Sequence, residues 1–85
     1  MMPKLSHNLR TNYAPDGAVV LDIVRGRIFR LNPTGSRILQ MIESGRAEEE
    51  ITSMLVREFS ANAMVAASDI GEFLANLKSH SLLES

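Results

Sequence analysis

The amino-acid sequence predicts an α+β fold in which a three-stranded antiparallel sheet is followed by three helices. Up to Leu31, apolar and polar side chains alternate between turn residues, which is typical of short strands. From Asn32 onward, apolar residues recur every three or four positions, which is typical of amphipathic helices. With 85 residues and no long linker, we expect a single domain over residues 1–85.

Three strands are predicted, over residues 5–13, 18–23 and 27–31. The segment 14–17 (APDG) separates the first two, because its proline fixes φ and its glycine can take positive φ. The segment 24–26 (VRG) separates the second and third, and it is short enough to require an antiparallel hairpin. The strands should therefore form a meander.

The first helix is predicted over residues 33–44, because Asn32 is a favourable N-cap and Pro33 suits the first helical position. Gly45 should end it, since glycine takes the left-handed conformation without penalty. The small Gly35 allows another part of the chain to approach closely. The apolar face of this helix consists of Gly35, Ile38, Leu39 and Ile42.

The second helix is predicted over residues 47–59, with Glu48 to Glu50 in its first turn, where carboxylates interact favourably with the helix dipole. Its apolar stripe consists of Ile51, Met54, Leu55 and Phe59.

A third helix is predicted over residues 65–79, after a loop at 60–64. No strong N-cap precedes it, and Asp69 is expected in its first turn. Leu82 and Leu83 should fold back over the core, because two leucines on a free tail would remain in water. The apolar stripe of this helix consists of Ile70, Phe73, Leu74 and Leu77.

Composition limits the classes of function. The chain has no cysteine, so neither a disulfide framework nor a thiolate metal site is available. No segment has the apolar length of a signal peptide or of a membrane span, so we expect a cytoplasmic protein without a membrane partner. The formal net charge is -1, so binding of nucleic acid would require basic residues gathered on one face.

Catalytic chemistry is not predicted, and neither a cofactor nor a metal is expected. The two histidines, His7 and His80, lie near opposite ends of the chain without a motif around either, and we interpret both as structurally incidental. The glycines punctuate turns and do not form a phosphate-binding loop. Three methionines, Met41, Met54 and Met64, fit gap-filling positions in a core better than an adaptable binding surface.

A cluster of arginines lies in the first half of the chain, at positions 25, 27, 30 and 37. A short sheet with three helices resembles a winged helix-turn-helix, which often binds DNA through a basic helix. The two helices that would read DNA here are neutral to acidic, so they would repel a duplex. We therefore expect no nucleic-acid partner, and a DNA-binding regulator remains the alternative of another class.

If residues 27–31 form the last strand, its outer row of backbone groups is unpaired. Phe29 and Leu31 share the face that we assign to the core, and Ile28 and Arg30 share the other face. From the pattern alone, a docking edge for an extended peptide and an ordinary edge protected by its arginines are equally favoured. Pairing of the edge with a second copy would give a homodimer.

Several separated blocks, LD, GRIFRLNPTGSRIL, G followed by EEI, and DIGEFLANL ending in LL, occur in this order between Ala18 and Leu83. In these blocks the chain resembles the PqqD-like family of peptide recognition elements, which act in the biosynthesis of ribosomally made, post-translationally modified peptides. The resemblance implies a winged helix-turn-helix-like fold without catalytic activity. It also implies that the leader of a precursor peptide binds as an added strand between the third strand and the third helix.

The partners implied by the resemblance are the precursor peptide and a modifying enzyme, which in the pyrroloquinoline quinone pathway is a radical S-adenosylmethionine enzyme. This chain lacks the tryptophan and the Leu-Leu-x-Pro-Glu block of the pyrroloquinoline quinone proteins. Its LD-x-x-x-G form looks more like the recognition proteins of lasso-peptide clusters, whose partner is a leader peptidase. A basic strand opposite an acidic helix would orient the peptide by charge. The peptide-binding residues carried over are Arg27, Ile28, Phe29, Arg30, Leu31, Asp69, Glu72, Phe73 and Asn76.

Overall fold

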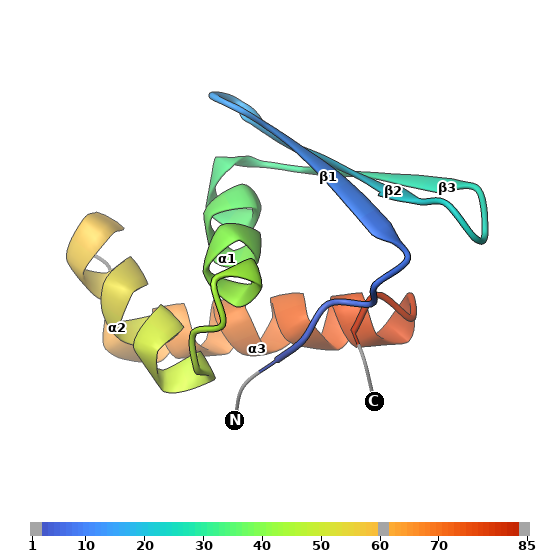
Figure 1. Cartoon of the computed structure of the whole chain (residues 1–85). Helices are drawn as coiled ribbons and strands as arrows, with labels where there is room; N and C mark the ends of the chain where they lie inside the picture. Colours follow the sequence, from blue (N-terminus) through green and yellow to red (C-terminus); the bar gives the residue numbers. More distant parts are fainter. Residues whose placement is uncertain (1–2, 60–61, 84–85) are drawn as a thin grey trace.

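The computed structural model describes residues 3–59 and 62–83, and within them the elements follow the predicted order. The strands form one antiparallel sheet in the order β1-β2-β3, which confirms the predicted meander. The helices lie on one side of this sheet (Figure 1). The elements are β1 (Leu9–Ala14), β2 (Gly17–Asp22), β3 (Arg27–Leu31), α1 (Pro33–Glu43), α2 (Glu48–Phe59) and α3 (Ala63–Ser79).

The first strand is shorter than predicted. It begins at Leu9 because a turn interrupts the chain at residues 7–8, while Leu5 forms an isolated bridge with Leu83. The backbone N–H of Ser6 donates to the Leu82 carbonyl at 2.8 Å. The predicted strand over residues 5–13 is therefore wrong in its first half, which pairs with the C-terminal segment instead of the sheet.

The core lies between the sheet and the helices. The predicted apolar face of α1 is buried in full, and the buried Leu82 confirms that the C-terminal leucines fold back. Met41 is buried as predicted, whereas Met64 is largely exposed and fills no gap. The buried cluster consists of Val20, Ile38, Leu39, Met41, Ile42, Ile51, Leu55, Ile70, Leu77 and Leu82.

The third helix begins earlier than predicted, at Ala63, because Asn62 is an N-cap that the sequence pattern did not reveal. The Asn62 side-chain oxygen accepts from the backbone N–H of Met64 at 2.8 Å and of Val65 at 3.3 Å. Asp69 consequently lies beyond the first turn, so the dipole explanation given for it is wrong. The predicted loop at 60–64 falls partly on Ser60 and Ala61, which lie outside the described residues.

The first two helices are joined by a bidentate ion pair. The Arg37 guanidinium donates to both Glu58 carboxylate oxygens, at 2.8 and 2.7 Å, and this lowers the pKa of the Glu58 carboxyl. One arginine of the basic cluster therefore has a structural role.

Phe59 at the end of α2 is half exposed, which contradicts its assignment to the apolar stripe. None of the described helices has the length and apolarity needed to cross a membrane.

Candidate functional site

One edge of the sheet is formed by β3, which pairs within the described residues with β2. The direction of the backbone groups follows from the turn between these strands. The Asp22 carbonyl accepts from the Gly26 N–H at 2.8 Å, so Asp22 faces β3. The next residue, Ile23, donates its N–H to the Asn8 carbonyl at 3.2 Å, so it faces the opposite side.

From this point, successive residues of the antiparallel ladder direct their backbone N–H and C=O groups alternately toward and away from the neighbouring strand. Asp22 lies opposite Arg27, and the next residues in the same phase on β3 are Phe29 and Leu31. These three residues therefore direct their backbone N–H and C=O groups toward β2. Ile28 and Arg30 direct theirs away from the sheet, into the open edge.

The other edge of the sheet, β1, is less available. The Arg10 guanidinium donates to the Leu9 carbonyl at 2.9 Å and to the His7 carbonyl at 3.4 Å, and the Leu9 N–H donates to the Ser6 carbonyl. The same alternation directs the backbone of Leu9 outward. The chain thus covers the start of β1 with its own side chain and its own N-terminal segment.

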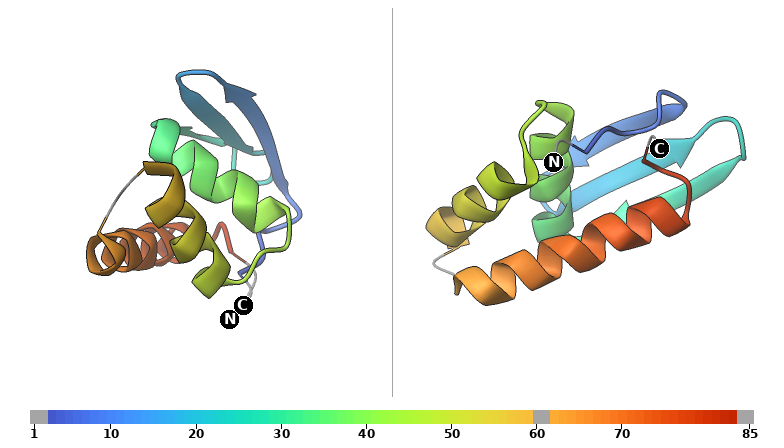
Figure 2. Two further views of the ribbon diagram at one scale, coloured as in Figure 1. Left: turned by 90° about the vertical axis from the view of Figure 1, so that its left-hand side faces the viewer. Right: turned by 90° about the horizontal axis from the view of Figure 1, so that it is seen from below.

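The third helix runs beside β3 in the opposite direction, as the right-hand view of Figure 2 shows. At one end, the Arg27 guanidinium donates to the His80 carbonyl at 2.6 Å, and the Phe29 and His80 ring centroids are 5.2 Å apart. At the other end, a Cβ at Gly35 would lie 3.1 Å from the Phe73 ring and 3.5 Å from Leu31 Cβ. Gly35 thus provides the close approach predicted for it.

The predicted α3 residues share one helical face, because their spacing is i, i+3, i+4 and i+7. Phe73 is half-buried, and the other three residues, Asp69, Glu72 and Asn76, are exposed. Asn76 lies on the helix surface between Phe73 and His80, the two residues in contact with the β3 side. Asp69 lies a further turn toward the N-terminus of α3, away from β3.

The β3 side chains divide between the two faces of the sheet as predicted. Arg27, Phe29 and Leu31 are partly buried on the helix side, whereas Ile28 and Arg30 are exposed on the opposite side. The structure therefore brings Arg27 and Phe29 together with His80, and Leu31 and Phe73 together around Gly35. Ile28 and Arg30 contribute to this edge through their backbone and not through their side chains.

Asp22, which the sequence reasoning did not include in the site, organises the end of β3. Its carboxylate is 1% exposed and accepts from the backbone N–H groups of Val24 and Arg25, at 3.2 and 3.1 Å. It also accepts from the guanidinium groups of Arg25 and Arg27, at 3.3 and 3.1 Å. The backbone hydrogen bond from Arg25, followed by those from the arginines, lowers the Asp22 pKa to about 2. The signal in the sequence was an aspartate at the start of a short turn, because an Asp side chain there can accept from the backbone N–H groups two and three residues later.

The charge of Arg27 is therefore paired within the sheet, with Asp22. Its guanidinium carbon lies 5.1 Å from the Phe29 ring centroid. The Arg27 Nε atom is buried and has no hydrogen-bond acceptor among the described residues. Such unsatisfied buried donors are uncommon, and this one belongs to the edge strand β3.

His80 was predicted to be incidental, and this is wrong. It follows α3 as the C-cap, and both its carbonyl and its ring contact β3 side chains. The helical spacing from Phe73 through Asn76 to His80 was the available signal, because the three residues lie on one face.

The free energy of unfolding is expected to fall at acidic pH, because Asp22 then becomes protonated. A lowered folded-state pKa contributes stability that is present above the unfolded value, about 3.9, and is lost as the pH falls through about 2. We expect Asp22→Asn to lower the thermal unfolding midpoint by about 5 °C at pH 7. The difference from the unmodified chain should shrink steadily between pH 4 and pH 2, measured by circular dichroism. A difference that stays constant down to pH 2 would contradict this role of the Asp22 charge.

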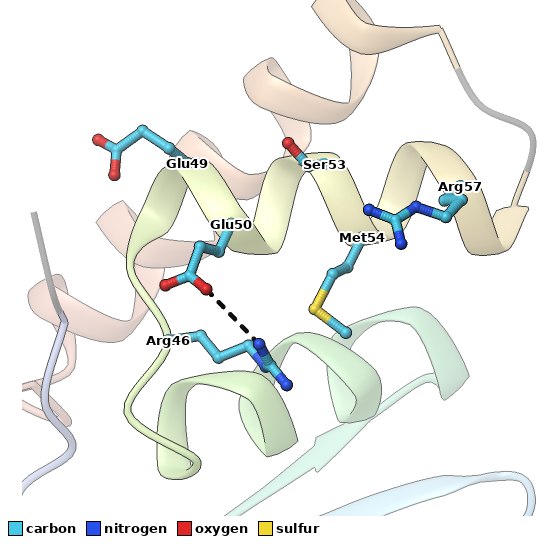
Figure 3. Close-up of a pocket in the computed structure, with 6 residues that line it drawn as sticks. All are labelled: Arg46, Glu49, Glu50, Ser53, Met54 and Arg57. Carbon is cyan, nitrogen blue, oxygen red and sulfur yellow. Dashed lines mark ion pairs between the residues drawn. The ribbon is translucent and has the colours of Figure 1, made fainter.

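Two cavities among the described residues lie elsewhere. The larger, about 440 Å³, is on the outer side of α2, where Figure 3 shows Met54 pointing toward α1. Its charged groups stabilise the start of that helix, since Glu50 accepts from the Ala47 N–H at 3.1 Å and pairs with Arg46 at 3.5 Å. The smaller, about 410 Å³, is beside β1 and includes Leu5 and Leu9. Neither lies against the open edge of β3.

A strand edge that is open among the described residues, beside a helix, defines a small α+β domain whose geometry suits the binding of an extended segment. The chain belongs to the PqqD family, since the family model described as coenzyme PQQ synthesis protein D (PqqD) matches residues 17–83. The predicted family and fold are thus confirmed, and the winged helix-turn-helix is only a loose description of this fold. No curated protein matches the chain.

Two solved structures are similar. TbiB1 in complex with the TbiA(beta) leader peptide is 32% identical, with a TM-score of 0.92 over 96% of this chain and 95% of that chain. Lasso peptide synthetase B1 complexed with the leader peptide is 22% identical, with a TM-score of 0.90 over 100% of both chains. At 22% identity, the similarity to the second structure concerns the fold alone.

Proposed function

We propose that this chain binds the leader of a ribosomally made precursor peptide as a fourth strand on β3, beside α3, and performs no chemistry on it. The observation that carries the proposal is the open edge of β3, where the backbone of Ile28 and Arg30 faces outward. The 32% identical TbiB1, whose structure holds a leader peptide, supports the same class of ligand.

The open edge would supply affinity and the adjoining side chains would supply preference. Main-chain hydrogen bonds form with any extended sequence, whereas alternate side chains of the peptide would point toward α3. There they would meet the half-buried rings of Phe29 and Phe73. A carbonyl or carboxylate of the peptide would also provide an acceptor for the buried Arg27 Nε.

The consequence for the pathway is tethering. A leader held on this chain raises the effective concentration of the attached core peptide at a maturation enzyme, without a catalytic group from the chain itself. The LD-x-x-x-G form of the β2–β3 turn favours a leader peptidase as that enzyme over a radical S-adenosylmethionine enzyme. Its first residues are Leu21 and Asp22, and Asp22 holds the turn in place.

Hydrogen exchange of individual backbone amides tests where the peptide binds. With a synthetic peptide of the leader encoded in the same gene cluster, we expect slower exchange at Ile28 and Arg30, because their N–H groups become hydrogen-bonded. The amides of Thr11 and Tyr13, which the ladder directs toward the other edge, should be unchanged. Protection at Thr11 and Tyr13, or at neither edge, would contradict binding on β3.

Phe73 is expected to contribute to affinity. Replacing Phe73 with alanine should weaken leader binding by about tenfold, because an apolar wall beside the peptide is lost. The measurement is titration calorimetry. Val65→Ala on the same helix is the matched control, since Val65 is 55% exposed and lies two turns before Phe73. Equal affinity of the Phe73 and Val65 variants would show that α3 takes no part in recognition.

A further inference from the structure

The face of the sheet that points away from the helices carries an unusual set of side chains. Half-exposed antiparallel sheets normally place polar residues on the solvent side. Here the solvent side of the central strand β2 carries Val19 and Leu21, and Ile23 continues the same alternation into the turn. We name the apolar residues of this side, with Ile28 of β3, the outer face.

The strand register arranges the outer face in rows across the sheet. One row runs from Arg10 on β1 to Leu21 on β2 and Ile28 on β3. The next row consists of Asn12, Val19 and Arg30. Leu21 and Ile28 are thus directly paired neighbours, and both are exposed, at 38% and 64%. Val24, in the adjoining turn, is 66% exposed.

The charged side chains that the strands place on the outer face have one sign. Arg10 flanks the apolar stripe on the β1 side and Arg30 flanks it on the β3 side. The three strands contain a single acid, Asp22, which is buried on the opposite face. The outer face is therefore an apolar stripe between two arginines, without a carboxylate from the strands that carry it.

We propose that the outer face docks a maturation enzyme, through a surface on that enzyme that is apolar and bordered by carboxylates. The charge complementarity selects this occupant over a second copy, because two copies related by symmetry would bring arginines against arginines. The proposal rests on the proposed function, since the leader on the edge of β3 would lie next to the docked enzyme. Alternate residues of one strand would then serve both partners, Phe29 facing the leader and Ile28 facing the enzyme.

The test uses the full chain and the purified leader peptidase or radical enzyme of the same gene cluster. Leu21→Thr combined with Ile23→Thr removes apolar surface from the outer face, keeps strand-forming residues and leaves β3 unchanged. We expect this variant to weaken association with the enzyme by about tenfold or more, measured by sedimentation velocity. Arg30→Glu should weaken it further and should reduce its dependence on salt.

Two controls separate this proposal from the proposed function. Leader affinity of the double variant, by calorimetry, should stay within about twofold, because neither substitution is on β3, the strand with which the peptide is proposed to pair. Val65→Thr, a matched exposed change on α3, should not affect association with the enzyme. Undiminished enzyme association of the double variant would overturn the docking proposal, and absence of leader binding by the unmodified chain would overturn only the proposed function.

The other possible occupants give distinct results. Concentration-dependent dimers of the chain alone that disappear in the double variant would overturn the proposal in favour of a second copy. Flotation of the chain with vesicles of phosphatidylglycerol and phosphatidylcholine, lost in the double variant, would overturn it in favour of an anionic membrane surface. A monomeric chain that does not float with these vesicles, yet binds the enzyme, would support it.

Discussion

Replacing Ile28 with proline is expected to weaken leader binding by about tenfold or more while the chain remains folded. The Ile28 side chain is 64% exposed, and its backbone N–H faces the open edge. Proline is tolerated at such a position because no bond to β2 is lost. The added strand, in contrast, loses a donor and meets the proline ring. The measurement is titration calorimetry with the leader peptide, after the fold has been checked by circular dichroism.

Two further variants make this prediction specific. Ile28→Ala removes the same side chain and retains the N–H, so it should bind the leader nearly as well as the unmodified chain. Phe29→Pro removes a donor directed toward β2 and should disrupt the sheet itself. Equal losses in the Ile28→Ala and Ile28→Pro variants would show that the side chain, and not the strand edge, determines binding.

The sequence predicted β3 with the bounds that the structure shows, Arg27–Leu31, because local signals agree there. The alternation of side chains starts after the turn glycine, and Asn32 and Pro33 start the next helix at once. Asn32 is the N-cap that the pattern predicted, and its side chain accepts from the Gly35 N–H at 2.8 Å. The open edge, on which the proposed function depends, was therefore readable from neighbouring residues.

The end of the site near His80 was not readable in the same way. Arg27 and the His80 carbonyl are 53 positions apart in the chain, and their hydrogen bond exists only once α3 is packed beside the sheet. From the sequence, Arg27 fitted a peptide-docking edge and an edge protected by its own arginines equally well. The partner of Arg27 in the structure is Asp22, which lies directly opposite it on the preceding strand. This contact is set by the register of the hairpin.

Gly17→Ala is expected to be among the most destabilising single changes in the chain. Gly17 has φ +147°, which side-chain-bearing residues rarely adopt, and a Cβ there would collide with the Leu31 carbonyl oxygen at the end of β3. The colliding atom is backbone and cannot rotate away. Gly17 is further fixed because its carbonyl accepts from the buried Ser36 hydroxyl at 3.3 Å. We expect a loss of about 3 kcal/mol or more in the free energy of unfolding, measured by urea denaturation.

Gly26→Ala is the matched control, because Gly26 also has positive φ, +66°, but a Cβ there would meet nothing within 4 Å among the described residues. This change should cost only the backbone strain, about 1 kcal/mol. The larger loss expected for Gly17→Ala combines its less accessible φ with the collision with Leu31. Because Leu31 ends the strand that the leader is proposed to pair with, Gly17→Ala should also weaken leader binding under conditions where it is still folded, whereas Gly26→Ala should not. Equal losses of stability in the two variants would show that strain at φ, and not the packing of β2 against the end of β3, explains the need for glycine.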